Sequence, residues 1–214
     1  MNVVYLDIKA AFDSVDRLAL WNALRGRGIP DVLLDLIVAL HENTSVRVRL
    51  LKQLSDPLPT TSGVRQGCVL APVLFCVAID WILRHMKSKP GVTVGRDLTD
   101  LVYADDTAFF VDSPTSATAC LSSFVDTASV LGLQISWPKT KTQNLGSGLQ
   151  PDTILVNGNR VDPVLIFCCK HLEICYSFIF ASNLYQSSRT WEVLSRLMVS
   201  VAQIYADVSG SLPQ

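Results

Sequence analysis

The stretch Asp100-Leu-Val-Tyr-Ala-Asp-Asp-Thr-Ala-Phe-Phe-Val111 places two adjacent carboxylates between two short apolar runs. These flanks predict a β-hairpin with Asp105 and Asp106 at its turn, because side chains alternate along strands. Adjacent like charges repel, and an apolar setting raises that cost unless a cation neutralises them. A divalent metal site is one interpretation, and an ordinary surface turn is the other, because Asp is common in turns.

A further carboxylate follows an apolar run near the start of the chain. Residues 3–6 are apolar on both faces, which predicts a central strand covered on both sides, with Asp7 at its end. A buried acid there is costly unless it is paired or bound to a metal. Asp13 or Ser14 is expected to cap a helix over residues 15–27, so a helix start is the simpler interpretation of Asp13.

Three carboxylates thus come from one strand end and one hairpin turn. If Asp7, Asp105 and Asp106 met in space, they could hold two Mg²⁺ ions about 3.5–4 Å apart. Oxygen ligands of this kind suit Mg²⁺ or Mn²⁺ rather than zinc.

Four sequence blocks occur in an order that is typical of one enzyme family. They are Leu6-Asp-Ile-Lys-Ala-Ala-Phe-Asp13, Ser62-Gly-Val-Arg-Gln-Gly-Cys-Val-Leu-Ala-Pro-Val-Leu-Phe75, Tyr103-Ala-Asp-Asp106 and Leu131-Gly-Leu-Gln-Ile-Ser-Trp-Pro-Lys-Thr-Lys141. With them the chain resembles the reverse transcriptase domain of non-LTR (LINE-type) retrotransposons over about residues 2–145. The second block is the most specific of the four.

The resemblance implies an α+β fold of the polymerase palm type, an antiparallel sheet backed by helices. It assigns residues 1–145 to the palm and residues 146–185 to a divergent hairpin and primer-grip-like region. Residues 186–214 would be the helical start of a thumb or a disordered tail. The expected chain is a palm with the fingers absent and the thumb mostly absent.

The resemblance also assigns the chemistry. Asp7 and Asp105 would be the main ligands of two Mg²⁺ (or Mn²⁺) ions, and Asp106 would be a weaker third acid. Lys139 would approach the pyrophosphate as a general acid. Taken alone, Lys139 and its neighbour Lys141 would be read as a solvated surface.

Four residues would form the nucleotide-binding site: Ile8, Phe12, Gln66 and Gly67. Phe12 would be the wall under the sugar that excludes a 2′-hydroxyl, the group that distinguishes RNA from DNA building blocks. Glycine allows close approach of the backbone to a ligand. Without the resemblance, Phe12 would be read as a core residue and Gly67 as an ordinary loop glycine.

The implied function is RNA-directed DNA synthesis, with an RNA template, a DNA primer and dNTPs as partners. The second hypothesis is an inactive retroelement remnant, or a non-catalytic module that binds nucleic acid or another partner. It is motivated by the expected loss of the fingers and by His171 and Glu173, where the family has Tyr and Gly. A related palm enzyme, an intron-encoded reverse transcriptase or a nucleotide cyclase, is the third.

The composition fits a folded domain, but the net charge does not indicate a nucleic-acid partner. The 214 residues carry a net charge of −1, a pI of about 6.3 and 49% hydrophobic residues. The six cysteines lack zinc spacing, which favours core thiols and a reducing, intracellular location, nuclear or cytoplasmic. No signal peptide is expected, and residues 164–181 contain too many charges for a membrane span.

Further elements are expected along the chain. Periodicity predicts a helix over residues 31–40 with Val32, Leu33, Leu36, Ile37 and Leu40 inward, and a half-exposed strand over residues 46–50 with Arg47 and Arg49 on one face. These arginines are read as a solvated face or as a nucleic-acid contact. Other expectations are a Pro-rich connection over residues 56–61, helices over residues 72–86, 114–131 and 191–208, and a hairpin around Asn157-Gly158.

Overall fold

A computed structural model describes residues 1–93, 97–103, 105–145 and 151–165. The helices are α1 (Ala11–Ser14), α2 (Arg17–Gly26), α3 (Asp31–His41), α4 (Ala71–His85) and α5 (Pro114–Val130). The main strands are β1 (Asn2–Lys9), β8 (Asp100–Tyr103), β9 (Asp106–Val111), β10 (Gln134–Ile135), β11 (Lys141–Asn144), β12 (Ile154–Val156) and β13 (Asn159–Pro163). Short ribbons are formed by β2 (Ser45–Val46) with β5 (Leu58–Pro59), β3 (Arg49–Leu50) with β4 (Gln53–Leu54), and β6 (Val92–Thr93) with β7 (Asp97–Leu98).

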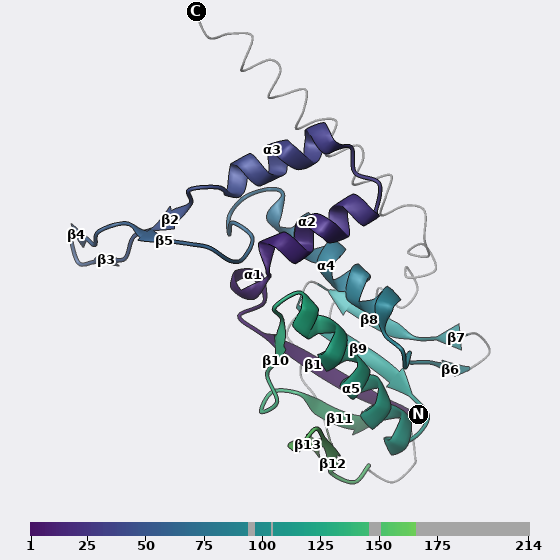
Figure 1. Ribbon diagram of the computed structural model, residues 1–214. Helices are drawn as coiled ribbons and strands as arrows, with labels where there is room; N and C mark the ends of the chain where they lie inside the picture. Colours follow the sequence, from purple (N-terminus) through teal and green to yellow (C-terminus); the bar gives the residue numbers. More distant parts are fainter. Residues whose placement is uncertain (94–96, 104, 146–150, 166–214) are drawn as a thin grey trace, which may run out of the picture.

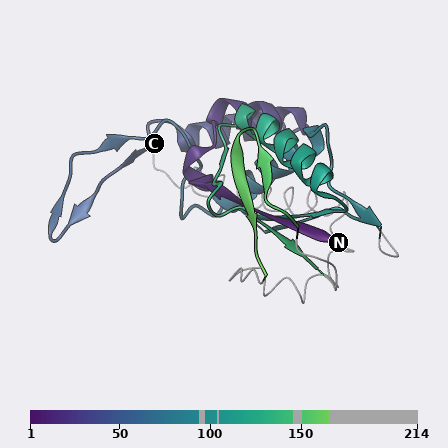
Figure 2. The same cartoon turned by 90° about the horizontal axis from the view of Figure 1, so that it is seen from below.

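The seven main strands form one sheet in the order β12-β13-β11-β1-β9-β8, with β10 also paired to β1. All pairs are antiparallel except β11 with β13. The expected α+β class with an antiparallel-rich sheet is therefore confirmed. Helices lie against one side of this sheet, as the view from below shows (Figure 2).

The first strand is central, as its apolar run predicted. Its neighbours are β9 on one side and β10 and β11 on the other (Figure 1). Val4 and Leu6 belong to the large core shared with the helices. Val3 lies on the opposite face in a small second cluster with Ala108 and Phe110. The strand is thus apolar on both faces because both faces are covered by other side chains.

The helices over residues 72–86 and 114–131 are confirmed as α4 and α5, within one residue at their ends. The hairpin around Asn157-Gly158 is also confirmed, since β12 pairs with β13 across it. Both turn residues have positive φ (50° and 80°), the conformation that favours Asn-Gly in two-residue hairpin loops.

The expected N-terminal cap of the helix over residues 15–27 was wrong. Asp16, rather than Asp13 or Ser14, caps α2, because its carboxylate accepts a hydrogen bond of 2.7 Å from the N–H of Ala19. Asp13 lies inside the single turn of α1.

The buried stripe of α3 also differs from the expected one. It consists of Leu34, Ile37 and His41, while Val32 is 80% exposed. The helix packs on α2 and not into the centre of the core, so only a narrow stripe is buried. The sequence has apolar residues on more than one side of this helix, and periodicity alone could not select the buried one.

The expected half-exposed strand over residues 46–50 is present only in part, as two short strands that are fully exposed, and the expected connection over residues 56–61 contains a short strand. They form two sides of one ribbon, β2–β5 and β3–β4, which extends from the body of the molecule (Figure 1). We call residues 44–60 the arm. Within the described ranges no layer covers either face of the arm, so its alternating pattern does not produce a buried side.

The expected primer-grip stretch with His171 and Glu173 and the expected helix over residues 191–208 lie outside the described residues. The same holds for most of the apolar run 164–181. Within the described ranges, no helix has both the length and the apolar character needed to cross a membrane.

Backbone hydrogen bonds hold the second sequence block against the end of the first. The N–H of Gly63 donates to Val15 and that of Val64 to Phe12, each at 2.8 Å. Gly63 has φ +76°, and a Cβ at this position would lie 2.7 Å from backbone atoms of Phe12 and Asp13. Only glycine fits where the two blocks meet.

We expect Gly63→Ala to lower the free energy of unfolding by about 2–5 kcal/mol. The left-handed backbone costs an L-residue about 1–2 kcal/mol, and the clash with fixed backbone adds roughly 1–3 kcal/mol. Gly67→Ala is the matched control, because Gly67 has φ +80° but open space around it, so only the first cost of about 1–2 kcal/mol applies. Urea unfolding followed by circular dichroism measures both; equal losses would contradict the packing described here.

Candidate active site

The antiparallel register between β1 and β9 brings two of the expected acids together. Asp7 lies directly opposite Asp106 in the ladder, and residues directly opposite share one face of the sheet. Asp105 lies in the turn between β8 and β9, next to Asp106. The hairpin prediction is therefore confirmed, with the carboxylates contributed by a strand end and a turn as expected.

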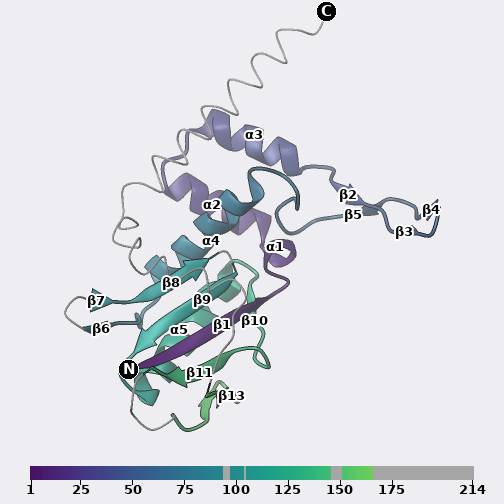
Figure 3. The same cartoon turned by 180° about the vertical axis from the view of Figure 1, so that it is seen from behind.

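The acids lie on the face of the sheet away from α5. Side chains alternate, so Val3, Tyr5 and Asp7 point to one side, and Ala108 and Phe110 on β9 point to the same side. Figure 3 views the sheet with α5 behind it. The carboxylates of Asp7 and Asp106 therefore extend the small apolar cluster at its end rather than entering the large core.

Another acid in the same hairpin is placed differently. Asp100 pairs with Phe109 at the other end of β8 and so lies on the helical face. Burial raises the pKa of its carboxyl, while a hydrogen bond from Thr99 opposes that shift. The Asp100 side chain thus lies on the opposite face of the sheet from Asp7 and Asp106 and does not belong to their site.

Lys139 reaches the same site from the fourth sequence block. Its Nζ lies 3.4 Å from Oδ2 and 3.5 Å from Oδ1 of Asp7. Oδ2 is buried and has no hydrogen-bond partner among the described residues. The lysine side chain is 71% exposed, so this ion pair contributes little stability, and it leaves the buried oxygen available to a stronger cation.

The segment Ser136–Thr140 positions Lys139 through hydrogen bonds to the backbone of Asp7. β1 pairs first with β11 and then with β10, and the chain between them leaves the ladder beside Asp7. The N–H of Ser136 donates to the carbonyl of Asp7 at 2.8 Å, and the hydroxyl of Thr140 lies 3.5 Å from its N–H. Thr140 is fully buried, so this segment is part of the sheet's framework.

Phe12 occupies a position that fits its expected role as a wall. Its ring stacks on Phe75 with centroids 4.7 Å apart and an interplanar angle of 19°. Phe75 is completely buried, whereas Phe12 is only half-buried. One face of the Phe12 ring thus rests on the core, which fixes its orientation.

Gln66 and Gly67 lie on the exposed surface of the second block. The amide Nε2 of Gln66 donates a 2.7 Å hydrogen bond to Oδ1 of Asp13. The hydroxyl of Ser62 donates to the carbonyl of Asp13 at 2.9 Å. Asp13 therefore orients Gln66, a role that sequence reasoning missed because no local pattern links residues 53 positions apart.

Ile8 is the expected site residue whose side chain is placed elsewhere. It is 3% exposed and belongs to the large core, on the face opposite Asp7. A contact between Ile8 and a nucleotide could therefore come only from its backbone.

The carboxylates of Asp7, Asp105 and Asp106 are suitable ligands for a hard divalent cation, although the three are not gathered into one cluster. Carboxylate oxygens are the ligands that Mg²⁺ and Mn²⁺ prefer, and the buried Oδ2 of Asp7 lacks a hydrogen bond. Among the described residues, no group of three or more His, Cys, Asp or Glu side chains is close enough to hold a metal ion. The structure thus brings Asp7 and Asp106 together and leaves Asp105 beside them in the turn.

A comparison with protein-family models matches residues 2–190 to the family described as "Reverse transcriptase (RNA-dependent DNA polymerase)". This match covers most of the chain and includes all four sequence blocks.

Similar curated proteins are Pol polyproteins of retrotransposable elements. The chain is 28% identical over 155 residues to that of the type-2 element R2DM of Drosophila melanogaster, covering 72% of this chain and 15% of the relative. It is 31% identical over 121 residues to that of a type-1 element R2 of Nasonia vitripennis, covering 56% and 12%. A Popillia japonica R2 relative is 32% identical over 127 residues, covering 56% and 21%. The chain therefore spans at most about a fifth of the length of these three relatives.

We expect Mn²⁺ to stabilise the protein through the paired acids. At a concentration about ten times its Kd, a ligand bound to the native state adds about 1.4 kcal/mol, which corresponds to a rise in Tm of about 4 °C. Asp7→Asn and Asp105→Asn should remove most of this rise, measured by thermal denaturation in MnCl₂ against EDTA.

The control for this experiment is Asp126→Asn. Asp126 is exposed on α5, which packs on the other face of the sheet, so the rise should be preserved. An unchanged rise in Asp7→Asn would show that the cation binds elsewhere.

Proposed function

Since the chain belongs to the reverse transcriptase (RNA-dependent DNA polymerase) family, we propose that its sheet is a polymerase palm that extends a DNA primer on an RNA template. The observation that carries this proposal is the register that sets Asp7 opposite Asp106, with Asp105 in the adjoining turn. The resemblance to non-LTR reverse transcriptase domains, predicted from the four blocks, is confirmed by the matches to the family and to R2 proteins.

In this proposal the primer 3′-hydroxyl gives up its proton to solvent water, and its oxygen forms a bond to the α-phosphorus of a dNTP. The bond between that phosphorus and the bridging oxygen breaks, and pyrophosphate leaves. Asp7, Asp105 and Asp106 would hold two Mg²⁺ or Mn²⁺ ions, which supply charge neutralisation at the phosphates and lower the pKa of the primer hydroxyl. The chain's own contribution is to place these carboxylates on a rigid ladder.

Lys139 is the proposed general acid for the leaving pyrophosphate. In the absence of substrate its ammonium group pairs with Asp7. With Asp7 engaged as a metal ligand, Lys139 would be free to turn toward the β-phosphate, and its Nζ would donate a proton to the departing oxygen. The exposed position of its side chain allows that movement.

The nucleotide would lie between Phe12 and the second block. Phe12 is supported from below by Phe75, so its ring cannot retreat easily from a bulky 2′-substituent. Gln66 is oriented by its hydrogen bond to Asp13, the residue that follows Phe12. Gly67 leaves open space around its backbone, which permits close approach of a substrate.

A second candidate is a non-catalytic module that binds nucleic acid. The observation that favours it is the absence of a three-ligand group among the described side chains, which would weaken metal binding. Such a module would keep the fold and the exposed basic residues but would not turn over dNTPs.

The test of polymerase function is primer extension on an RNA template with dNTPs and Mg²⁺ or Mn²⁺. We expect extension by the full chain and a loss of about a thousandfold or more in Asp105→Ala, because the reaction depends on charge neutralisation at the phosphates. Circular dichroism confirms folding of both proteins. Equal extension by Asp105→Ala would refute the proposal, and a folded wild type that binds Mn²⁺ without extending primers would favour the second candidate.

Phe12→Val should relax the choice of sugar. Removing the ring opens space for a 2′-hydroxyl, and steric discrimination of this size is worth roughly 10–200-fold. We therefore expect the ratio of kcat/KM for dNTP over rNTP to fall at least tenfold, with the value for dNTP nearly retained. Phe12→Tyr is the matched control, because it keeps the ring; an unchanged ratio in Phe12→Val would assign Phe12 to the core alone.

A further inference from the structure

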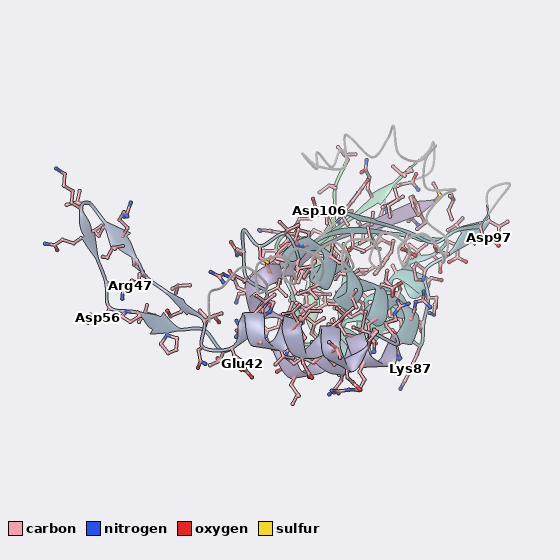
Figure 4. The ribbon with its side chains drawn as sticks, turned by 90° about the horizontal axis from the view of Figure 1, so that it is seen from above. Glu42, Arg47, Asp56, Lys87, Asp97 and Asp106 are labelled. Atoms are coloured by element: carbon pink, nitrogen blue, oxygen red, sulfur yellow. The ribbon has the colours of Figure 1, made fainter. Side chains whose placement is uncertain are left out.

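The arm is the part of the described structure that protrudes furthest from the sheet and helices. Its two strands run outward side by side from α3 and return toward the second block (Figures 1 and 2). Arg47 and Asp56 are seen on it far from Asp106 (Figure 4). A two-stranded ribbon of this kind is only marginally stable by itself, so what fixes its base matters.

The base of the arm is fixed by one arginine. Arg17 on α2 donates to the carbonyls of His41 and Thr60 at 2.7 and 3.0 Å, one on each side of the arm's root. It also donates to the hydroxyl of Thr44 at 3.0 Å, which in turn lies 2.7 Å from the hydroxyl of Thr60. The arm is therefore held in a set direction at its root.

The same arginine connects the arm to the candidate active site. Its Nε donates to the carbonyl of Gly63 at 2.9 Å. Gly63 is packed against the backbone of Phe12 and Asp13, beside the proposed nucleotide site. The arm's root is thus one residue away from the block that carries Gln66.

Charge is segregated onto the arm. Of the chain's 18 Lys and Arg and 19 Asp and Glu, the arm holds three and one, so the arm carries +2 and the rest of the chain −3. Arg47, Arg49 and Lys52 form no ion pair with any described residue, and all three are exposed. These cations are therefore available to an anionic partner.

The apolar side chains of the arm, between and beside these cations, are also exposed. Exposed fractions are 53% for Val46, 58% for Val48, 74% for Leu50, 93% for Leu51, 52% for Leu54 and 50% for Leu58. Leu51 at the tip has φ +56°, an uncommon and costly conformation for a bulky residue. A surface with exposed apolar side chains next to unpaired cations suits a partner that offers both phosphates and bases or sugars.

We propose that the arm binds single-stranded RNA, holding the template by its phosphates as it approaches the second block. The proposal rests on the proposed polymerase function, which it deepens by assigning a contact outside the acid site. Arg47, Arg49 and Lys52 contact phosphates, and the apolar residues between them contact sugars and bases. The unpaired positive charge on a chain that is otherwise acidic favours RNA over a protein partner, which needs no such excess.

The test is equilibrium binding of the full chain to a labelled 20-nucleotide single-stranded RNA at several salt concentrations. Each phosphate contact with a single strand contributes about −0.7 to the slope of log K against log salt. The triple variant Arg47→Ala, Arg49→Ala, Lys52→Ala should therefore have a slope shallower by about 2 and bind at least roughly tenfold more weakly at 0.1 M salt.

Two further variants serve as controls. Arg47→Lys, Arg49→Lys, Lys52→Arg keeps the charges and should keep the slope. Arg25→Ala, Lys87→Ala, Arg160→Ala removes three exposed cations elsewhere and should leave binding nearly unchanged. Circular dichroism verifies that each protein is folded.

An unchanged slope and affinity in the arm triple variant would overturn the proposal, as would a wild type that does not bind this RNA. Self-association that Leu50→Ser, Leu51→Ser abolishes without any change in RNA binding would overturn it in favour of a protein contact. Because no catalysis is measured, the outcome is independent of primer extension. If primer extension required Asp105 but RNA binding were unaffected by the arm triple variant, the arm proposal would be rejected and the proposed polymerase function would stand.

Discussion

The structure depends on one constraint, the pairing register between β1 and β9. It places Asp7 opposite Asp106, and a slip by one residue would turn one of them toward the helices. The register is enforced by apolar residues on both faces, with Val4 and Phe109 on the helical side and Val3 and Phe110 on the other. The burial that stabilises the sheet thus also brings like charges together, a repulsion that Lys139 offsets at Asp7 and that a divalent cation would offset further.

The other blocks are arranged around that strand. The segment Ser136–Thr140 leaves the ladder beside Asp7 and thereby brings Lys139 to it, while Gly63 fastens the second block to residues 12–15. Arg17 then joins Gly63 to the root of the arm, so that the acids, the proposed nucleotide wall and the basic ribbon belong to one connected framework. The low net charge of the chain conceals a separation between an acidic body and a basic arm.

Sequence patterns predicted the parts of this framework that are local. The apolar run before Asp7, the flanks of Asp105 and Asp106 and the proline starts of α4 and α5 each fix an element through nearby residues. Strand character in the arm was predicted in part, but its exposure on both faces was not, because alternation does not reveal whether another layer packs against a ribbon. Contacts such as Gln66 with Asp13, or Arg17 with Thr60, join distant positions and leave no periodic signal, so the sequence could suggest the site residues but not what orients them.

The most direct measurement of the central claim is paramagnetic broadening of amide NMR signals in the full chain by substoichiometric Mn²⁺. If the register creates a cation site, the signals of Asp7, Asp106 and their ladder neighbours should broaden first, followed by those around Lys139. Signals on α5, behind the sheet, should broaden least. Broadening that is uniform over the molecule, or that centres on acids such as Asp97 or Asp56, would contradict the account, because the paired carboxylates would then not be the metal site.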